Sequence, residues 1–298
     1  MSTRDLRLLY YLTESSLRRL VERSLEEDLG RGDVTTDSLI PPDATGRAVF
    51  RSRSPGVIAG LEVARMVYSV ADAAVQFDAR IADGSSVVPG QEIAVVAGPA
   101  RALLHGERVA LNFLQRLSGI ASLTSRYVEA VRGTRARVVD TRKTTPGLRA
   151  LEKYAVRAGG GFNHRRDLSD AMLIKDNHLA VIDRLGLSVG EAIRQAREAL
   201  PHTLRIEVEV DRLDQIAEVL AAGADIILLD NMAIEELKQA VELIGGRAIV
   251  EVSGGVTLAT ISDIAKTGVD VISVGALTHS AAALDIGLDF EVETVQRT

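Results

Sequence analysis

Two adjacent cations, Arg142 and Lys143, lie in a polar loop between the short apolar run 137–139 and the helical stretch 148–158. Arg can grip a carboxylate or phosphate through two parallel hydrogen bonds, whereas Lys supplies a mobile point charge. Three threonine hydroxyls, that of Thr141 among them, and a Pro-Gly turn complete the loop. These residue types suit an anion site, although an ordinary basic turn would show the same Arg-Lys pair.

Polar or glycine-rich residues follow each of six short apolar runs in the second part of the chain. In chain order they are Asp140-Thr141-Arg142-Lys143, Lys175-Asp176-Asn177-His178, Glu209, Asp230-Asn231, Ser253-Gly254-Gly255 and Gly275-Ala276. A further group, His164-Arg165-Arg166, stands in the loop after Gly159-Gly160-Gly161. One polar strand end would be unremarkable, but six in succession describe a single pocket, because barrel enzymes build their active sites at the C-terminal ends of the strands.

The last two strand ends, 253–255 and 274–276, are small and glycine-rich. Small residues let backbone N–H groups approach an anion where the next helix begins. Barrels frequently hold a phosphate at their final loops, so these two loops predict a phosphate-bearing ligand. A lone glycine pair also makes ordinary tight turns, and it is the cations on the same rim that favour the phosphate interpretation.

Two carboxylates, Glu209 and Asp230, stand on neighbouring strand ends among these cations. They could accept hydrogen bonds from sugar hydroxyls, or they could hold a hard divalent ion such as Mg²⁺ through oxygen ligands. Structural ion pairs with Lys175 or Lys143 are the alternative. Glu207 shares the alternating side of Glu209 but lies deeper in the strand, so it ranks second.

Apolar strands alternate with helical stretches from residue 137 onward. The predicted strands are 137–140, 171–174, 205–210, 225–230, 248–252 and 269–274, and the predicted helices are 148–158, 188–200, 211–222, 234–244 and 258–266. Repeated βα units with near-continuous apolar strands require a parallel sheet whose faces are covered by helices. Six strands are too few for a closed eight-stranded barrel, and the polar strand ends favour an incomplete barrel over a doubly wound sheet.

The first part of the chain lacks this strict alternation. Its pattern predicts strands at 44–53, 57–60, 74–81 and 92–96 and helices at 17–29 and 61–70, which is typical of an α+β domain with a mainly antiparallel sheet. A long helical pattern, 103–132, interrupted at Ser118-Gly119, then joins the two domains. Arg108 lies in this helix, where a solvated or salt-bridged side chain is the simplest role on pattern alone.

Composition excludes several classes of protein. The chain has 298 residues, which suggests two domains more readily than one. A net charge of −6 argues against a broad nucleic-acid-binding surface, and the absence of cysteine removes disulfides, thiolate catalysis and zinc–thiolate sites. No apolar stretch is long enough to span a bilayer, and the Arg- and Glu-rich start does not look like a secretory signal. A cytoplasmic enzyme is therefore expected.

The sequence resembles the quinolinate phosphoribosyltransferases, also called carboxylating nicotinate-nucleotide pyrophosphorylases, of NAD biosynthesis. The resemblance covers nearly the whole chain and rests on Glu27–Gly30, Gly32–Thr36, Glu107–Ala121, Asp140–Arg149, Lys153–Val156, Gly159–Gly161, Asn163–Arg165, Leu173–His178, Glu207–Glu209, Leu229–Met232 and Ser253–Gly255. Val109 stands where many members are expected to carry Thr, a minor departure.

The resemblance implies an α/β fold of two domains. Residues 1–117 are expected to form an N-terminal α/β sandwich with an antiparallel sheet, and 118–279 a six-stranded incomplete α/β barrel, with the tail 280–298 packing back on the first domain. Homodimers or larger homo-oligomers are expected to place the first domain of one subunit over the barrel mouth of another. Arg108 would then reach a neighbour's site, in contrast to the role that the pattern alone suggests.

The resemblance also implies the reaction of a type II phosphoribosyltransferase. The expected substrates are quinolinate and 5-phosphoribosyl 1-diphosphate, with magnesium, and the products are nicotinate mononucleotide, diphosphate and carbon dioxide. The two carboxylates of quinolinate are expected to meet Arg108, Arg142, His164, Arg165 and Lys175. The phosphates are expected at Lys143, magnesium and the loops Ser253-Gly254-Gly255 and Val274-Gly275-Ala276, and Thr141 is also expected to bind substrate.

Lys143, Lys175, Glu209 and Asp230 are the expected catalytic residues, and Glu209 and Asp230 are the expected metal ligands. Positive charge develops on the ribose as diphosphate leaves, so the two acids would stabilise the sugar while Lys143 and magnesium stabilise the leaving group. Loss of the carboxylate next to the ring nitrogen needs no enzyme nucleophile, because the electrons fall toward a cationic ring.

Three alternatives stay open. A paralogous phosphoribosyltransferase could share these motifs and act on another base. Lys175 or Lys143 could instead form a Schiff base, which would make the chain a barrel lyase. A non-catalytic phosphate-sensing barrel would explain the glycine loops but would leave Arg142, Glu209 and Asp230 without a purpose.

Overall fold

The computed structural model describes residues 11–291, whose contacts form two compact units. Of the described residues, 11–125, 145–160 and 280–291 form the first unit, and 126–144 with 161–279 form the second. The domain border expected at 117/118 stays a prediction, since a grouping by contacts and a folding boundary need not coincide. Among the described residues, no helix is both long and apolar enough to cross a membrane.

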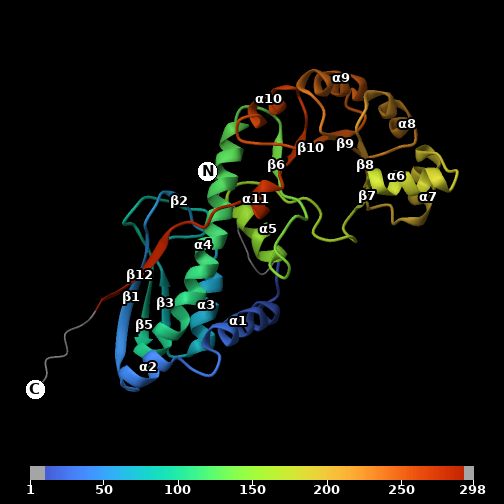
Figure 1. The fold of residues 1–298 in the computed structure, drawn as a ribbon. Coiled ribbons are helices and arrows are strands. Elements are labelled where there is room, and N and C mark those ends of the chain that lie inside the picture. The colour runs from blue at the N-terminus through green and yellow to red at the C-terminus, as the bar shows by residue number, and fades with distance from the viewer. Residues whose placement is uncertain (1–10, 292–298) are drawn as a thin grey trace, which may run out of the picture. The chain divides into compact units, whose positions relative to one another are not determined.

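A four-stranded antiparallel sheet, in the order β12-β1-β5-β3, forms the centre of the first unit (Figure 1). Three aromatic rings, Phe50, Tyr68 and Phe77, meet edge-on or tilted in its core. The elements are α1 (Glu14–Leu29), α2 (Val34–Leu39), β1 (Thr45–Ser52), β2 (Gly56–Val57), α3 (Leu61–Ala71), β3 (Gln76–Ala79), β4 (Ser86–Val87), β5 (Glu92–Pro99), α4 (Ala100–Ala130), α5 (Arg149–Ala158) and β12 (Ile286–Glu291). The antiparallel sheet confirms the fold expected for the first part of the chain.

Helix α4 runs through Ser118-Gly119, so the expected interruption there is wrong. The buried Ser118 hydroxyl hydrogen-bonds to the backbone of Ala59, 3.0 Å from its N–H and 3.3 Å from its carbonyl oxygen. A Cβ at Gly119 would collide with the carbonyl oxygen of Ala282. These two residues therefore serve close packing on the helix surface, and helix propensity alone misjudged them.

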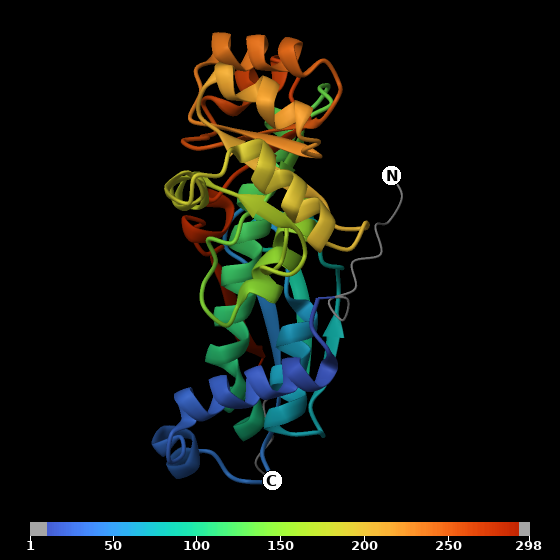
Figure 2. The same ribbon diagram turned by 90° about the vertical axis from the view of Figure 1, so that its right-hand side faces the viewer.

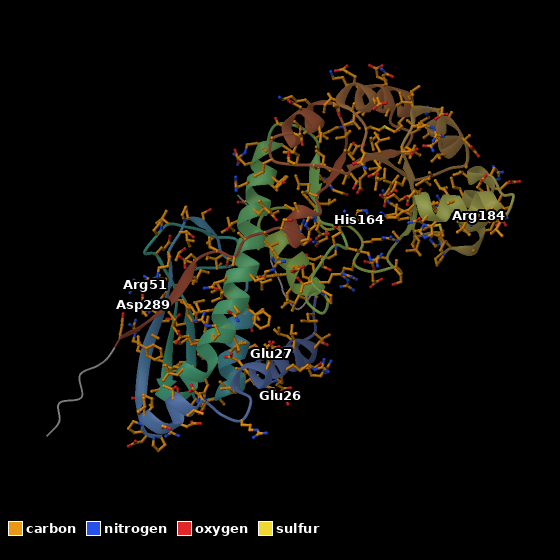
Figure 3. The ribbon with its side chains drawn as sticks, in the orientation of Figure 1. Glu26, Glu27, Arg51, His164, Arg184 and Asp289 are labelled. Carbon is orange, nitrogen blue, oxygen red and sulfur yellow. The ribbon has the colours of Figure 1, made fainter. Side chains whose placement is uncertain are left out.

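Strand β12 lies antiparallel to β1, with Leu288 opposite Phe50. Arg51 on β1 lies 3.5 Å from the carboxylate of Asp289 on β12, and both are labelled in Figure 3. The described part of the C-terminal tail, 280–291, therefore packs within the first unit, as expected. Residues 292–298 of that expected tail lie outside the described residues.

The second unit is built on a six-stranded parallel sheet in the order β6-β11-β10-β9-β8-β7. Helices α8 to α10, orange in Figure 2, lie along the outer side of its last strands. The strands are β6 (Arg137–Val139), β7 (Met172–Ile174), β8 (Ile206–Val210), β9 (Ile226–Asp230), β10 (Ile249–Ser253) and β11 (Val271–Ser273). The expected incomplete six-stranded α/β barrel is thus confirmed.

The helices of this unit are α6 (Asp176–Arg184), α7 (Val189–Ala199), the 3₁₀ turn η2 (Leu213–Gln215), α8 (Ile216–Ala221), α9 (Ile234–Ile244), α10 (Ile261–Lys266) and α11 (Ala276–His279). Helix α6 begins directly after β7, where the sequence pattern indicates only a polar strand end. It buries none of its residues, and its few apolar side chains, such as Leu179 and Ile182, follow directly on the polar residues of the strand end, which obscured the helix in the sequence.

Candidate active site

A cavity of about 810 Å³ opens at the C-terminal ends of the parallel strands in the second unit. The predicted site residues that line it are Thr141, Arg142, Lys143, His164, Arg165, Lys175, Glu209, Asp230, Ser253, Gly254, Gly255, Gly275 and Ala276. Strand-end pattern alone gave no role to other lining residues, which include Asn231, Glu251, Ser273 and His279. Side chains that are two residues apart on a strand share a face, so the positions of Glu251 before Ser253 and Ser273 before Gly275 were the signals that could have found them.

Two predicted residues do not line the cavity. Val274 is buried, and its N–H donates a hydrogen bond to the Val139 carbonyl at 2.9 Å. The loop lines the cavity with Gly275 and Ala276, and the expected phosphate contact at Val274 stays a prediction. Arg108 belongs to α4 in the first unit, and its expected place in a neighbouring subunit's site stays a prediction.

Arg142 and Arg165 form a strongly cationic wall. The Nε atom of Arg142 is buried and has no hydrogen-bond partner among residues 11–291. Burial, together with the charge of Arg142, lowers the pKa of Arg165. An anionic ligand between the two guanidinium groups would provide a counter-charge and favour the charged form of Arg165.

The backbone around Lys143 is fixed from two sides. The Lys143 N–H donates to the Thr141 hydroxyl at 3.0 Å, and the buried Thr278 hydroxyl donates to the Lys143 carbonyl at 2.7 Å. A Cβ at Gly275 would lie 3.0 Å from Cδ of Lys143 and 3.2 Å from Nε2 of His279. The glycine therefore lets two basic side chains pass close to the loop, which suits a phosphate site.

Gly254 and Gly255 both have left-handed backbones, with φ of +88° and +59°. Side chains at such φ values are strained, and a Cβ at Gly254 would also collide with Oδ1 of Asn231. Helix α10 begins only at Ile261, so the N–H groups of this loop do not form a helix start as expected. Any anion here would be held by the loop itself.

Glu209 and Asp230 stand at the ends of the adjacent strands β8 and β9. Nζ of Lys175 lies 3.3 Å from Oε2 of Glu209. The ion pair with Lys175, which the sequence offers as a structural role for the acids, is therefore present. Burial and the charge of Glu209 raise the pKa of Asp230, which shows that the carboxylates are close enough to repel. Two mutually repelling carboxylates with a partial countercharge fit a hard divalent cation such as Mg²⁺, which one or two carboxylates, waters and substrate phosphates usually hold.

His164, labelled in Figure 3, joins a buried cluster beneath the rim. Its Nε2 lies 3.2 Å from Oε2 of Glu207 and 3.3 Å from Oε1 of Glu251, and the Ser273 hydroxyl donates to Glu251. Burial by itself would lower the pKa of His164, but its hydrogen bonds to the two carboxylates raise the pKa to about 10.

The proton on this imidazole can be placed. The Arg165 N–H donates to Nδ1 of His164 at 2.8 Å, which requires an unprotonated Nδ1. The ring then carries its proton on Nε2, and the extra proton that the cluster favours is shared with the carboxylates, because burial also raises the pKa of Glu207. The ligand atoms of His164, Glu207 and Glu251 lie within 4.8 Å of one another, and a metal ion at this spacing would have to displace the Nε2 proton.

Comparison with known proteins decides the family. A family model described as the C-terminal domain of quinolinate phosphoribosyl transferase matches residues 120–289, and the model of the N-terminal domain matches residues 33–118. The chain belongs to the quinolinate phosphoribosyltransferase family. The resemblance noted in the sequence is thereby confirmed.

Relatives in the quinolinate phosphoribosyltransferase family match nearly end to end. The chain is similar to the probable carboxylating nicotinate-nucleotide pyrophosphorylase of Bacillus subtilis, at 43% identity over 92% of this chain and 93% of that protein. Identity to the Mycobacterium leprae enzyme of that name is 46%, over 91% of this chain and 96% of the relative. The crystal structure of NadC from Streptococcus pyogenes superimposes with a TM-score of 0.89 at 44% identity, covering 94% of this chain and 99% of that one.

Proposed function

We propose that this chain transfers the phosphoribosyl group of 5-phosphoribosyl 1-diphosphate to the ring nitrogen of quinolinate and releases the neighbouring carboxylate as carbon dioxide. The products are nicotinate mononucleotide and diphosphate, a step of NAD biosynthesis. One observation carries the proposal: in a chain of this family, Arg142, Arg165 and Lys175 line the same cavity as Glu209 and Asp230. The cavity therefore offers countercharge for a dianionic pyridine beside acids suited to a developing sugar cation.

Quinolinate is assigned to the cationic wall. The unpartnered Nε of Arg142 and the guanidinium of Arg165 would receive one carboxylate, and Lys175 would receive the other. His164 has its ring nitrogens engaged by Glu207, Glu251 and the Arg165 N–H, so it would shape the wall and orient Arg165 rather than donate to the substrate.

Phosphoribosyl transfer breaks the bond between C1 of the ribose and the diphosphate oxygen, and forms a bond from C1 to the pyridine nitrogen. Glu209 and Asp230 would stabilise positive charge on the ribose, and Lys143 with the loops 253–255 and 275–276 would receive the phosphates. Mg²⁺ held by Glu209 and Asp230 would neutralise negative charge on the diphosphate. Each group acts where charge develops, so it contributes mainly to turnover.

Decarboxylation then needs little from the protein. The electrons of the broken C–C bond fall toward the cationic ring nitrogen, carbon dioxide leaves, and the ring carbon takes up a proton. Positioning of the carboxylate by the cationic wall would suffice.

We also propose that the enzyme is a cytoplasmic homodimer or larger homo-oligomer in which Arg108 of one subunit enters a neighbour's cavity. The motif Glu107–Ala121, which contains Arg108, is among the stretches that resemble the family. Each carboxylate has several acceptor positions, so the two carboxylates of quinolinate can accept hydrogen bonds from one more guanidinium than Arg142 and Arg165 provide. Mixing Arg108→Ala subunits with Lys175→Ala subunits would restore activity if the sites are shared, and would restore none if each site is complete within one chain.

Product analysis with alternative bases tests the proposal. The purified protein is incubated with 5-phosphoribosyl 1-diphosphate, Mg²⁺ and either quinolinate or nicotinate, and nucleotides are separated by chromatography. Nicotinate mononucleotide is expected in the incubation with quinolinate and not in the incubation with nicotinate. A nucleotide formed from another base but not from quinolinate would instead indicate the paralogous specificity. In a separate incubation with a carbonyl substrate, an adduct trapped on Lys175 or Lys143 by borohydride would indicate the lyase.

A further inference from the structure

Asn231 has an unusual backbone for its residue type. Within residues 11–291 it is the one non-glycine residue with a positive φ, at +54°. L-residues enter this left-handed region at a cost, and Asn is tolerated there better than most because its short amide can hydrogen-bond locally. Such outliers persist where the surrounding structure holds them, often at functional sites.

Three contacts hold this conformation. The Asn231 side chain donates from Nδ2 to Oδ2 of Asp230 at 2.7 Å. Its backbone N–H donates to the Ser253 carbonyl at 3.1 Å. Its amide also lies directly against Gly254, where a Cβ would collide with Oδ1 of Asn231 and lie 3.0 Å from its backbone N. Asn231 therefore touches both the acid at the end of β9 and the loop at the end of β10.

The absence of a side chain at Gly254 has a specific use in this arrangement. With φ of +88°, the residue is left-handed, and the space that its Cβ would fill is taken by the Asn231 amide. Gly223 has nearly the same φ, +86°, but no atom lies within 4 Å of its Cβ position. The two glycines therefore separate the cost of backbone strain from the cost of losing the contact with Asn231.

We propose that Asn231 is a positioning residue for phosphoribosyl transfer, which its left-handed backbone enables by turning the side-chain amide onto Asp230 and against Gly254. Asp230, which is assigned to the ribose, and the loop 253–255, which is assigned to a phosphate, are thereby held at a fixed distance and orientation to each other. This inference rests on the proposed function, because it gives Asn231 a task in that reaction.

Three substitutions at Asn231 separate the amide from the backbone. Asn231→Gly keeps the left-handed turn and removes the amide, Asn231→Asp keeps the shape but replaces the donor with an acceptor, and Asn231→Ala removes the amide and strains the turn. Loss of an outer partner of a catalytic carboxylate typically costs about 10- to 100-fold in activity, so kcat should fall by that factor in all three. KM for the phosphoribosyl donor should rise, KM for quinolinate should stay unchanged, and only Asn231→Ala should also lower the melting temperature.

A purely structural role of Asn231 predicts a different pattern. Asn231→Gly would then be as active as wild type, because glycine adopts the turn without strain. Wild-type turnover in Asn231→Gly, or an equal rise of both KM values, would overturn the proposal.

The contact with Gly254 supplies the second test. Gly254→Ala should lower kcat and raise KM for the phosphoribosyl donor, whereas Gly223→Ala, with the matched φ, should leave both unchanged. In the Asn231→Gly background, Gly254→Ala should cost less than in wild type, because the colliding amide is gone. Strictly additive effects of the two substitutions would contradict the coupling.

An assay of the wild-type enzyme with quinolinate and the phosphoribosyl donor, run in parallel, distinguishes failure of the proposed function from failure of the inference about Asn231. An inactive wild type would overturn the proposed function and with it the task assigned to Asn231. An active wild type with fully active Asn231→Gly would overturn the inference alone.

Discussion

Glu207 and Glu209 lie two residues apart on β8, yet their surroundings differ sharply. Glu207 is 1% exposed and does not line the cavity. It pairs with His164, which also pairs with Glu251, and both of these lie at the bottom of the cavity wall. Glu209 lines the cavity and meets only Lys175 among the ion pairs of the described chain. Depth in the barrel thus separates the carboxylates into a floor pair, Glu207 and Glu251, and a rim pair, Glu209 and Asp230.

The difference teaches which carboxylates are available for chemistry. The floor pair has protein partners for its oxygens, and ligands can add little there. The rim pair is held less completely, and the raised pKa of Asp230 beside Glu209 records a repulsion that a substrate or cation could relieve. We therefore assign turnover to the rim pair and local stability to the floor pair.

Substituting the rim acids should have the largest effect. Glu209→Ala and Asp230→Ala should each lower kcat by about 10²- to 10³-fold, the usual cost of removing one group that stabilises transition-state charge. Steady-state kinetics at saturating substrate and a thermal melt of each variant measure this, and the melting temperature should stay near that of wild type. An unchanged kcat would assign these acids a structural role.

Substituting a floor carboxylate should lower stability more than turnover. Glu251→Gln removes one charge from a buried hydrogen-bonded cluster, and breaking such a pair typically costs about 3 kcal/mol of stability. Denaturant unfolding should show this loss, with the residual activity falling mainly through KM for quinolinate, since His164 supports Arg165. A Glu251→Gln protein as stable as wild type would erase the distinction between floor and rim.

Substitutions of the cations assigned to quinolinate should affect substrate binding rather than turnover or stability. Arg142→Ala and Lys175→Ala should each raise KM for quinolinate by about 10- to 100-fold, as expected for losing a hydrogen bond to a charged group worth about 1.5 to 3 kcal/mol. Both should fold normally, which circular dichroism can check. Wild-type-like use of quinolinate by either variant would reject the assigned carboxylate pocket.

The last expected effect leaves turnover aside and is a pH dependence of stability. The folded pKa of His164 is raised to about 10 from an ordinary value of 6.5. A raised pKa means that the cluster's contribution is fully present below about pH 6.5 and is lost as pH rises toward 10. Melting temperatures between pH 6.5 and 10 should fall more steeply for wild type than for Glu251→Gln. Equal slopes would show that the floor cluster does not hold this proton.

Sequence reasoning predicted the parallel strands well because each is a short, nearly continuous apolar run, such as Ile226–Leu229 ending at Asp230. The rim followed directly, since parallel strands place their C-terminal residues together. The antiparallel sheet was also recoverable, because β1 and β5 contain the short apolar runs Ala48–Phe50 and Ile93–Ala97 between turn residues.

The features that sequence reasoning did not predict depend on contacts between residues that are distant in sequence. Gly119 within α4 is explained by Ala282, and the glycine at 254 by Asn231. Helix α2 is missing from the predicted helices, although Asp33 caps its first turn by accepting from the N–H groups of Thr35 and Thr36 at 3.0 Å each. The floor cluster joins side chains from three strands and a loop, which no local pattern could bring together.

Release of labelled carbon dioxide is the most direct test of the central claim that one cavity joins quinolinate to an activated sugar phosphate. Quinolinate labelled in the carboxylate next to the ring nitrogen is incubated with the enzyme and Mg²⁺, with or without 5-phosphoribosyl 1-diphosphate. The label should appear as carbon dioxide only when the phosphoribosyl donor is present, in equal amount to nicotinate mononucleotide, and it should be nearly absent with Asp230→Ala. Label release without the donor, or none with it, would contradict the account.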